Sequence, residues 1–168
     1  MQDPVPTVTA TQNLLCLALR KNIAVNTALT TYLRPEMLSA RTWLAGFTVA
    51  QHLVHLCNDV KHWAGYVDGE RAGLLPTLAL PSEYDNLSTE WLEQVQRTWN
   101  GAERLVVELV TECRSGDKGT LPHPSIEMYA VHLLVHDSYH RGQMMAALKA
   151  AGYVMPDPDA SLWTVWRS

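Results

Sequence analysis

The chain has 168 residues, of which 47% are hydrophobic and 18% charged, and its net charge is -4 with the histidines neutral. These values exclude a disordered chain and fit one globular domain with a substantial core. Lysine and arginine are scattered, and no apolar run reaches the length of a membrane span. We therefore expect neither nucleic acid nor a membrane as a partner.

The three cysteines, Cys16, Cys57 and Cys113, are far apart in the chain and include no CxxC pair. An odd and sparse set of this kind is typical of reduced thiols rather than of a disulfide framework. The N-terminal residues lack the basic segment and apolar core of a signal peptide. These features predict a cytoplasmic protein.

Apolar periodicity predicts four helices and no strands. The first helix is expected over residues 8–33. The second opens at Thr48, which forms an S/T-x-x-E/Q capping box with Gln51, and the third follows over residues 88–113. The fourth covers residues 125–151 and stops at a glycine. Four long helices with mostly short links predict an all-α four-helix bundle.

The connections complete this expected single domain, residues 1–168, with its core at about 8–155. Residues 69–87 read as a long loop, which is either a crossover between helices or part of the rim of a site. We expect residues 74–84 of this loop to shape the entrance through which substrate reaches the site. The C-terminal tail, residues 156–168, is too apolar to stay free in solvent. We expect it to dock on the domain or on a partner chain.

Histidines four residues apart mark the fourth helix. His132, His136 and His140 drift by only about 40° per step on a helical wheel and so share one stripe. Val135 and Tyr139 occupy a neighbouring arc that we expect to be core. The histidine stripe should therefore border apolar surface.

A second histidine cluster lies in the second helix. His52, His55, Asp59 and His62 fall within an arc of about 80°, beside Trp63, which we expect in the core or at a helix interface. Imidazoles from two helices can hold a divalent ion such as Zn²⁺ or Ni²⁺. Three of them leave coordination positions open, as in reactive metal sites. The alternative is a set of hydrogen-bonded core histidines.

Two segments resemble one known family. Residues 47–56, FTVAQHLVHL, place an aromatic residue, a Ser/Thr cap and an apolar run before a histidine. Residues 135–144, VHDSYHRGQM, contain H-[DE]-x-x-H-R-G-Q. Both are similar to the helix-two and last-helix motifs of the DinB-like (YfiT-related) superfamily. The resemblance extends over about residues 8–155.

The resemblance implies that His55, His136 and His140 are the metal ligands. His52 stands where the family usually has an apolar residue, so it is the rival to His55. Asp137 fills the acidic position of the signature but points about 100° away from His136, which makes it a poor ligand. We expect Arg141 and Gln143 to take part in helix packing and hydrogen bonding, and Gly142 to allow a neighbouring helix to approach closely. His132 should lie in the core or hydrogen-bond near the ligands, and His62 should be exposed to solvent.

The family also implies an antiparallel bundle, often dimeric, with a metal at one end. Its members include thiol-dependent transferases, thiol-dependent isomerases of small acids, and stress-induced proteins. We therefore expect a metal-dependent thiol S-transferase that acts on small electrophiles in stress or detoxification. It would use Zn or Ni and a low-molecular-weight thiol, and would form a homodimer. The alternatives are a non-catalytic metal-binding stress-response dimer and a metal-dependent hydrolase.

Overall fold

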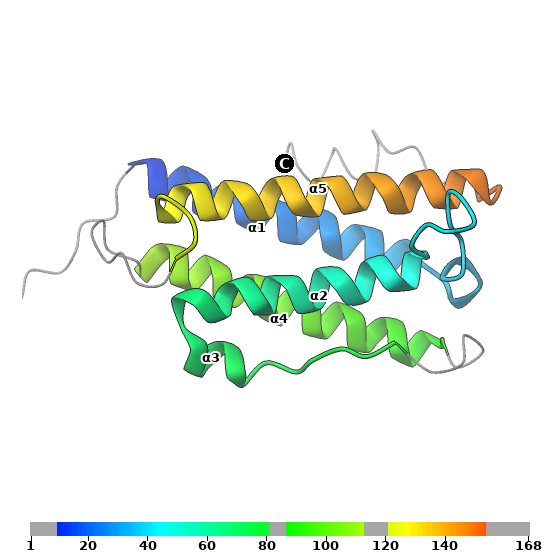
Figure 1. The fold of residues 1–168 in the computed structure, drawn as a ribbon, viewed down its shortest axis with the longest axis horizontal. Helices are drawn as coiled ribbons and strands as arrows, with labels where there is room; N and C mark the ends of the chain where they lie inside the picture. The colour runs from blue at the N-terminus through cyan, green and yellow to red at the C-terminus, as the bar shows by residue number, and fades with distance from the viewer. Residues whose placement is uncertain (1–9, 81–86, 113–120, 154–168) are drawn as a thin grey trace, which may run out of the picture.

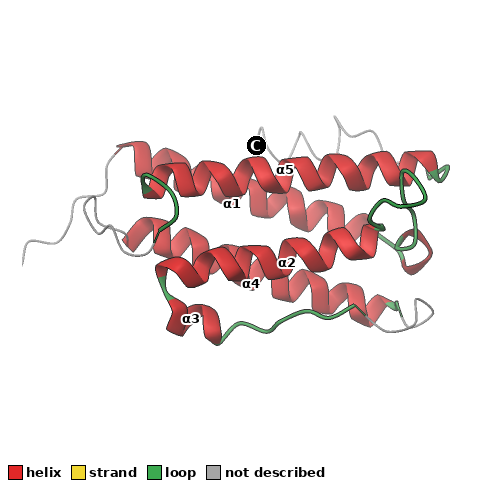
Figure 2. Ribbon diagram, viewed as in Figure 1, coloured by secondary structure: helices red, strands yellow, loops and turns green. Residues whose placement is uncertain are grey.

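Helices joined by loops make up the part of the chain that the structure, a computed structural model, describes: residues 10–80, 87–112 and 121–153 (Figure 2). The all-α prediction is confirmed. The predicted start of the first helix at residue 8, Cys113 and the apolar tail lie outside these residues. The helices are α1 (Ala10–Tyr32), η1 (Pro35–Met37), α2 (Val49–Val67), α3 (Gly69–Gly73), α4 (Thr89–Glu112) and α5 (Ile126–Ala150).

Four long helices lie side by side, but their directions are not simply alternating (Figure 1). Helix α1 packs against α4 and α5, and α2 likewise packs against α4 and α5. The α1/α4 and α2/α5 neighbours are antiparallel, whereas α1/α5 and α2/α4 are parallel (Figure 1). The antiparallel arrangement implied by the resemblance therefore holds for only two of these four helix contacts. The parallel α2/α4 pair requires a long connection, since α4 begins at the end where α2 also begins.

That connection is a crossover, as one of the two sequence readings proposed. The prediction of an uninterrupted loop is wrong, because Asp68 caps the short helix α3 through a hydrogen bond from the Arg71 backbone N–H. Beyond α3 the chain is attached to α2: the Asn58 side chain exchanges two hydrogen bonds with the Leu78 backbone, at 2.8 and 2.9 Å. These hydrogen bonds hold the described part of the crossover against α2.

Helix α2 begins where the sequence predicts. The Thr48 hydroxyl accepts a hydrogen bond from the Gln51 backbone N–H at 3.2 Å, and the Gln51 side chain accepts one from the Thr48 N–H at 2.8 Å. This capping box satisfies two amide groups that have no partner within the helix. It fixes the first turn of α2, from which His52 and His55 project.

The inward face of α5 differs from the predicted one. Val135 and Tyr139 are 62% and 61% exposed, so their assignment to the core is wrong. The buried face instead contains Asp137 and His140 among apolar residues such as Leu133. Polar partners on α1 and α4, described below, stabilise Asp137 in this position. No described helix is long and apolar enough to cross a bilayer.

Candidate metal centre

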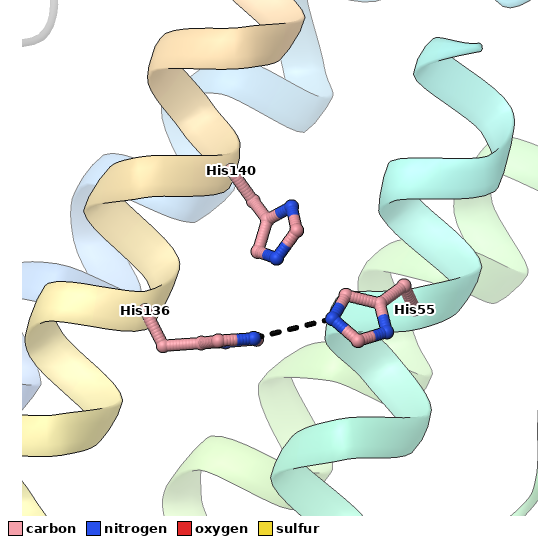
Figure 3. A group of neighbouring side chains, drawn as sticks. All are labelled: His55, His136 and His140. Carbon is pink, nitrogen blue, oxygen red and sulfur yellow. Dashed lines mark hydrogen bonds between the residues drawn. The ribbon is translucent and has the colours of Figure 1, made fainter. Parts of the chain in front are cut away.

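Three imidazoles from two helices meet between α2 and α5. His55 extends from α2, and His136 and His140 extend from adjacent turns of α5 (Figure 3). One ring nitrogen from each lies within 4.8 Å of the other two. His140 is buried, whereas His55 and His136 are partly exposed. The site can therefore be reached from solvent while its third imidazole is held inside the bundle.

The positions of the three nitrogens fit metal coordination better than they fit hydrogen bonding among the rings. The Nε2 atoms of His55 and His136 face each other at 3.2 Å, and His140 directs a ring nitrogen into the same gap (Figure 3). One hydrogen bond satisfies only two of three such nitrogens. A divalent ion that prefers imidazole would use all three lone pairs, at bond lengths of about 2.0–2.1 Å. The residues present thus fit a divalent metal.

His52 lies behind His140 rather than with the other two ligand candidates. It is 7% exposed, and its Nδ1 is 2.9 Å from Nδ1 of His140. One of these nitrogens must carry the proton of this hydrogen bond. When His140 donates from Nδ1, its Nε2 is unprotonated and free to bind a metal. His52 is thereby placed to select the useful tautomer of His140.

Asp59, which the sequence places on the same side of α2 as the histidines, lies at the solvent-accessible edge of the imidazole cluster. Asp59, one turn after His55, places Oδ2 3.5 Å from Nε2 of His136. The same oxygen accepts a hydrogen bond from the Trp63 indole N–H at 2.8 Å, which fixes the carboxylate. Asp59 is therefore a polar group held at the edge of the imidazole cluster and partly open to solvent.

The other half of the last-helix motif faces the bundle core. Asp137 is buried and accepts hydrogen bonds from the side-chain amides of Asn22 and Asn26, at 2.6 and 2.9 Å. Arg141 donates to the carbonyl oxygens of the same two asparagines. This position agrees with the expectation that Asp137 is a poor ligand. The local sequence does not indicate the network, because its asparagines lie on α1, more than 100 residues away.

Glu103 of α4 completes the network. Its Oε1 accepts hydrogen bonds from the side-chain amides of Asn22 and Asn26, and its carboxyl group interacts with that of Asp137. Burial, together with the charge of Asp137, raises the pKa of Glu103 well above its usual range. Two buried carboxyl groups in contact are best accommodated by one shared proton. One shared proton leaves the two carboxyl groups with a single negative charge, which the nearby guanidinium of Arg141 compensates.

The remaining sequence candidates lie outside the three-imidazole cluster. Cys57 is buried with its sulfur toward the Val95 carbonyl, and burial raises the pKa of its thiol, so it is no nucleophile. His62 is exposed, as predicted. The prediction for Gly142 is wrong, because a Cβ there would meet nothing within 4 Å. His132 contacts His123 and the Trp63 ring, and its own ring lies edge-on to that of His136 at the border of the cluster.

Comparison with known proteins identifies the family of the chain. Residues 10–166 match the family model described as the DinB family. The chain belongs to the DinB family. No curated protein and no solved structure matches it significantly. As a member of the DinB family it is expected to bind metal, and the three histidines that could hold the ion lie in its two motif-bearing helices.

The DinB signature in this chain thus serves two sides of one helix. Its histidines, His136 and His140, face α2 and the candidate metal site. Its charged residues, Asp137 and Arg141, face the asparagines of α1. Because both sets share two turns of α5, the buried network fixes the rotation of the helix and with it the direction of the imidazoles.

Acid should destabilise the metal-free protein through His140. Burial, with smaller contributions from His136 and His55, lowers the pKa of His140 from 6.5 to about 4. The folded state therefore excludes a proton that the unfolded chain binds. Stability from this group is complete above about pH 6.5 and is lost as pH falls toward 4. Urea unfolding should show a lower midpoint at pH 4.5 than at pH 7.

The control for this prediction is His140→Leu. Burial raises the pKa values of Glu103 and Asp137, so these groups favour the folded state on acidification, with the opposite sign. They are present in both proteins, and the comparison therefore isolates the histidine. A loss of stability on acidification that is as large in His140→Leu as in the wild type would contradict the prediction.

Proposed function

We propose that the protein is a metal-dependent thiol S-transferase that joins a low-molecular-weight thiol to a small electrophile in stress or detoxification. The observation that supports this most is the partly exposed cluster of three imidazoles, which leaves open positions on any ion it holds. Membership of the DinB family supports a metal site, and the transferase activity is our inference from the chemistry of that site.

His55, His136 and His140 are the proposed ligands, and Zn or Ni the proposed metal. Neutral imidazole suits both ions. When bound, the ion would lower the pKa of a coordinated thiol so that it reacts as the thiolate near neutral pH. The protein has no thiol of its own for this role among the described residues, because Cys16 and Cys57 are both buried. The nucleophile would therefore be a diffusible thiol.

Asp59 is the proposed proton acceptor. Its Oδ2 lies 3.5 Å from His136 Nε2 and is held there by the indole N–H of Trp63. In the transfer, the S–H proton passes to Asp59, the sulfur forms a bond to carbon of the electrophile, and the bond from that carbon to its leaving group breaks. The leaving group departs with its electron pair, so the step needs no oxidant or reductant.

The first alternative is a metal-binding stress-response dimer without catalysis. An exposed apolar stripe along α5 favours association, since Val135 and Tyr139 are largely exposed and Met128 and Val131 continue the stripe toward the start of the helix. A homodimer is accordingly part of the proposal in either case. The second alternative, a hydrolase, would use the same imidazoles and Asp59 with water in place of the thiol.

Turnover by the metal-loaded, untagged protein distinguishes these functions. Thiol consumption would be followed with a chloronitrobenzene or a bromobimane as electrophile and with several small thiols. We expect a rate above the uncatalysed reaction that disappears in His136→Ala and falls strongly in Asp59→Asn. Tight metal binding without turnover across all thiols would favour the stress-response dimer. Ester or amide hydrolysis without thiol consumption would favour the hydrolase.

His52 should tune the metal affinity without being a ligand. Replacing it with leucine, the type of residue common at this position in the family, removes the partner of His140 Nδ1. We expect the metal affinity to fall by about 10- to 100-fold, the usual cost of losing an outer hydrogen-bond partner. His52→Asn retains an acceptor at a similar position and should recover most of that loss.

Equilibrium dialysis against Zn²⁺ or Ni²⁺ measures these affinities. Complete loss of tight binding in His52→Leu together with full binding in His55→Ala would instead make His52 the α2 ligand. Nitrogen NMR of the metal-free protein provides a second readout. It should show the Nδ1-protonated tautomer of His140 in the wild type and a mixture of tautomers in His52→Leu.

A further inference from the structure

We propose that His123 and His132 form a second, weaker binding site for a divalent transition-metal ion, next to the three-imidazole cluster. Nε2 of His123 and Nδ1 of His132 point at each other at a distance of 2.8 Å. The two residues come from different segments: His132 from the second turn of α5 and His123 from the link that precedes it. Neither belongs to the first site.

The sequence holds His123 in place. It lies between Pro122 and Pro124, and a residue before proline is restricted to extended backbone conformations. A short, restricted link before the N-cap of α5 limits how far this imidazole can move from the helix. His132 is fixed by the helix itself. The pair is thus largely preorganised, so that little conformational entropy would be lost on binding an ion.

Trp63 forms one wall of the pair. Its ring lies edge-on to His132 and to His123, with ring centroids 4.7 and 5.2 Å apart. The indole is itself held by the hydrogen bond to Asp59. An apolar wall on one side excludes water there and leaves the other positions of an ion to solvent. Trp63, expected in the core or at a helix interface, is partly buried between α2 and α5.

The distance between the two nitrogens fits two ligands on one ion. With metal–nitrogen bonds of about 2.0–2.1 Å, nitrogens 2.8 Å apart subtend an angle of about 85°. That angle suits adjacent positions of a square or octahedral site, and a small outward movement reaches the tetrahedral one. Two protein ligands bind less tightly than three, so this site should fill after the first.

The competing explanation is a plain hydrogen bond between two neutral rings. Burial, and to a smaller extent His132, lowers the pKa of His123, which favours the neutral form of this ring. A neutral imidazole can carry its single N–H on either nitrogen. The nitrogens that face each other can therefore both present lone pairs to a metal without the loss of a proton. The same geometry serves either state, and titration with metal decides between them.

Zn²⁺ titration of the metal-stripped, untagged full chain by calorimetry tests the proposal. The wild type should show two binding events, and His62→Gln, an exposed histidine of α2, should keep both. His123→Gln and His132→Gln should each lose the weaker event and retain the tighter one. His136→Gln should lose the tighter event and retain the weaker one. Circular dichroism would show whether each variant is folded.

A single binding event in the wild type would overturn the inference, and so would a weaker event that persists in both His123→Gln and His132→Gln. The outcome is separate from that of the proposed function. If the tighter event is absent but a His132-dependent event remains, the three-imidazole proposal fails and the second site stands.

Discussion

Replacing His136 with alanine is expected to abolish tight metal binding at the three-imidazole cluster. His136 supplies one of the three imidazole nitrogens that lie within 4.8 Å of one another, and its Nε2 is 3.2 Å from that of His55. Two remaining imidazoles cannot close a site of the kind proposed. The loss of affinity should therefore exceed the roughly 100-fold upper range for outer-shell partners. Equilibrium dialysis with metal analysis measures it.

The matched control is His62→Ala, which removes an exposed histidine of α2. It should bind metal as the wild type does, with an unchanged unfolding midpoint. His140→Ala should behave as His136→Ala does. Wild-type affinity for metal in either α5 variant would mean that the cluster is only a set of hydrogen-bonded histidines, the alternative interpretation of the sequence.

Arg141→Met should be the most destabilising change in the buried network. The guanidinium donates to the side-chain oxygens of Asn22 and Asn26, which in turn donate to Asp137 and Glu103. Without it, two buried amide oxygens lose their donor and the buried carboxylate loses its compensating charge. Breaking an arrangement of this kind costs about 3 to 5 kcal/mol. Urea unfolding of the metal-free protein measures the change.

Arg97→Met is the corresponding control at the surface. Its pair with Glu93 spans 3.5 Å between side chains that are 70% and 61% exposed, so its loss should cost at most about 1 kcal/mol. Equal destabilisation by the two arginine variants would contradict the structural role assigned to Arg141. Asp137→Asn, which keeps the shape but removes the charge, should fall between them.

Local sequence signals predicted the elements of the fold and the residues of the candidate site. The capping box of Thr48 and Gln51 is made within one turn, so it can be read directly from the sequence, and it is confirmed. Ser88 similarly caps α4 through the Trp91 backbone N–H. The histidines of α5 share a stripe because spacing alone decides which residues share a helix face.

Spacing does not decide which face turns inward. Val135 and Tyr139 are more apolar than Asp137, which made their side the natural core, and that prediction is wrong. The helix is instead rotated so that Asp137 meets Asn22, Asn26 and Glu103. Those partners lie on other helices, and nothing in the local pattern of α5 indicates them. For the same reason the sequence offered His52 as a rival ligand, whereas its position behind His140 depends on how α2 and α5 pack.

The metal content of the untagged protein tests the central claim most directly. After purification, or after incubation with Zn²⁺ or Ni²⁺ and removal of the excess, the wild type should retain tightly bound metal, and His136→Ala prepared in the same way should retain none of it. A folded wild-type protein that carries no metal and refuses both ions would contradict the account.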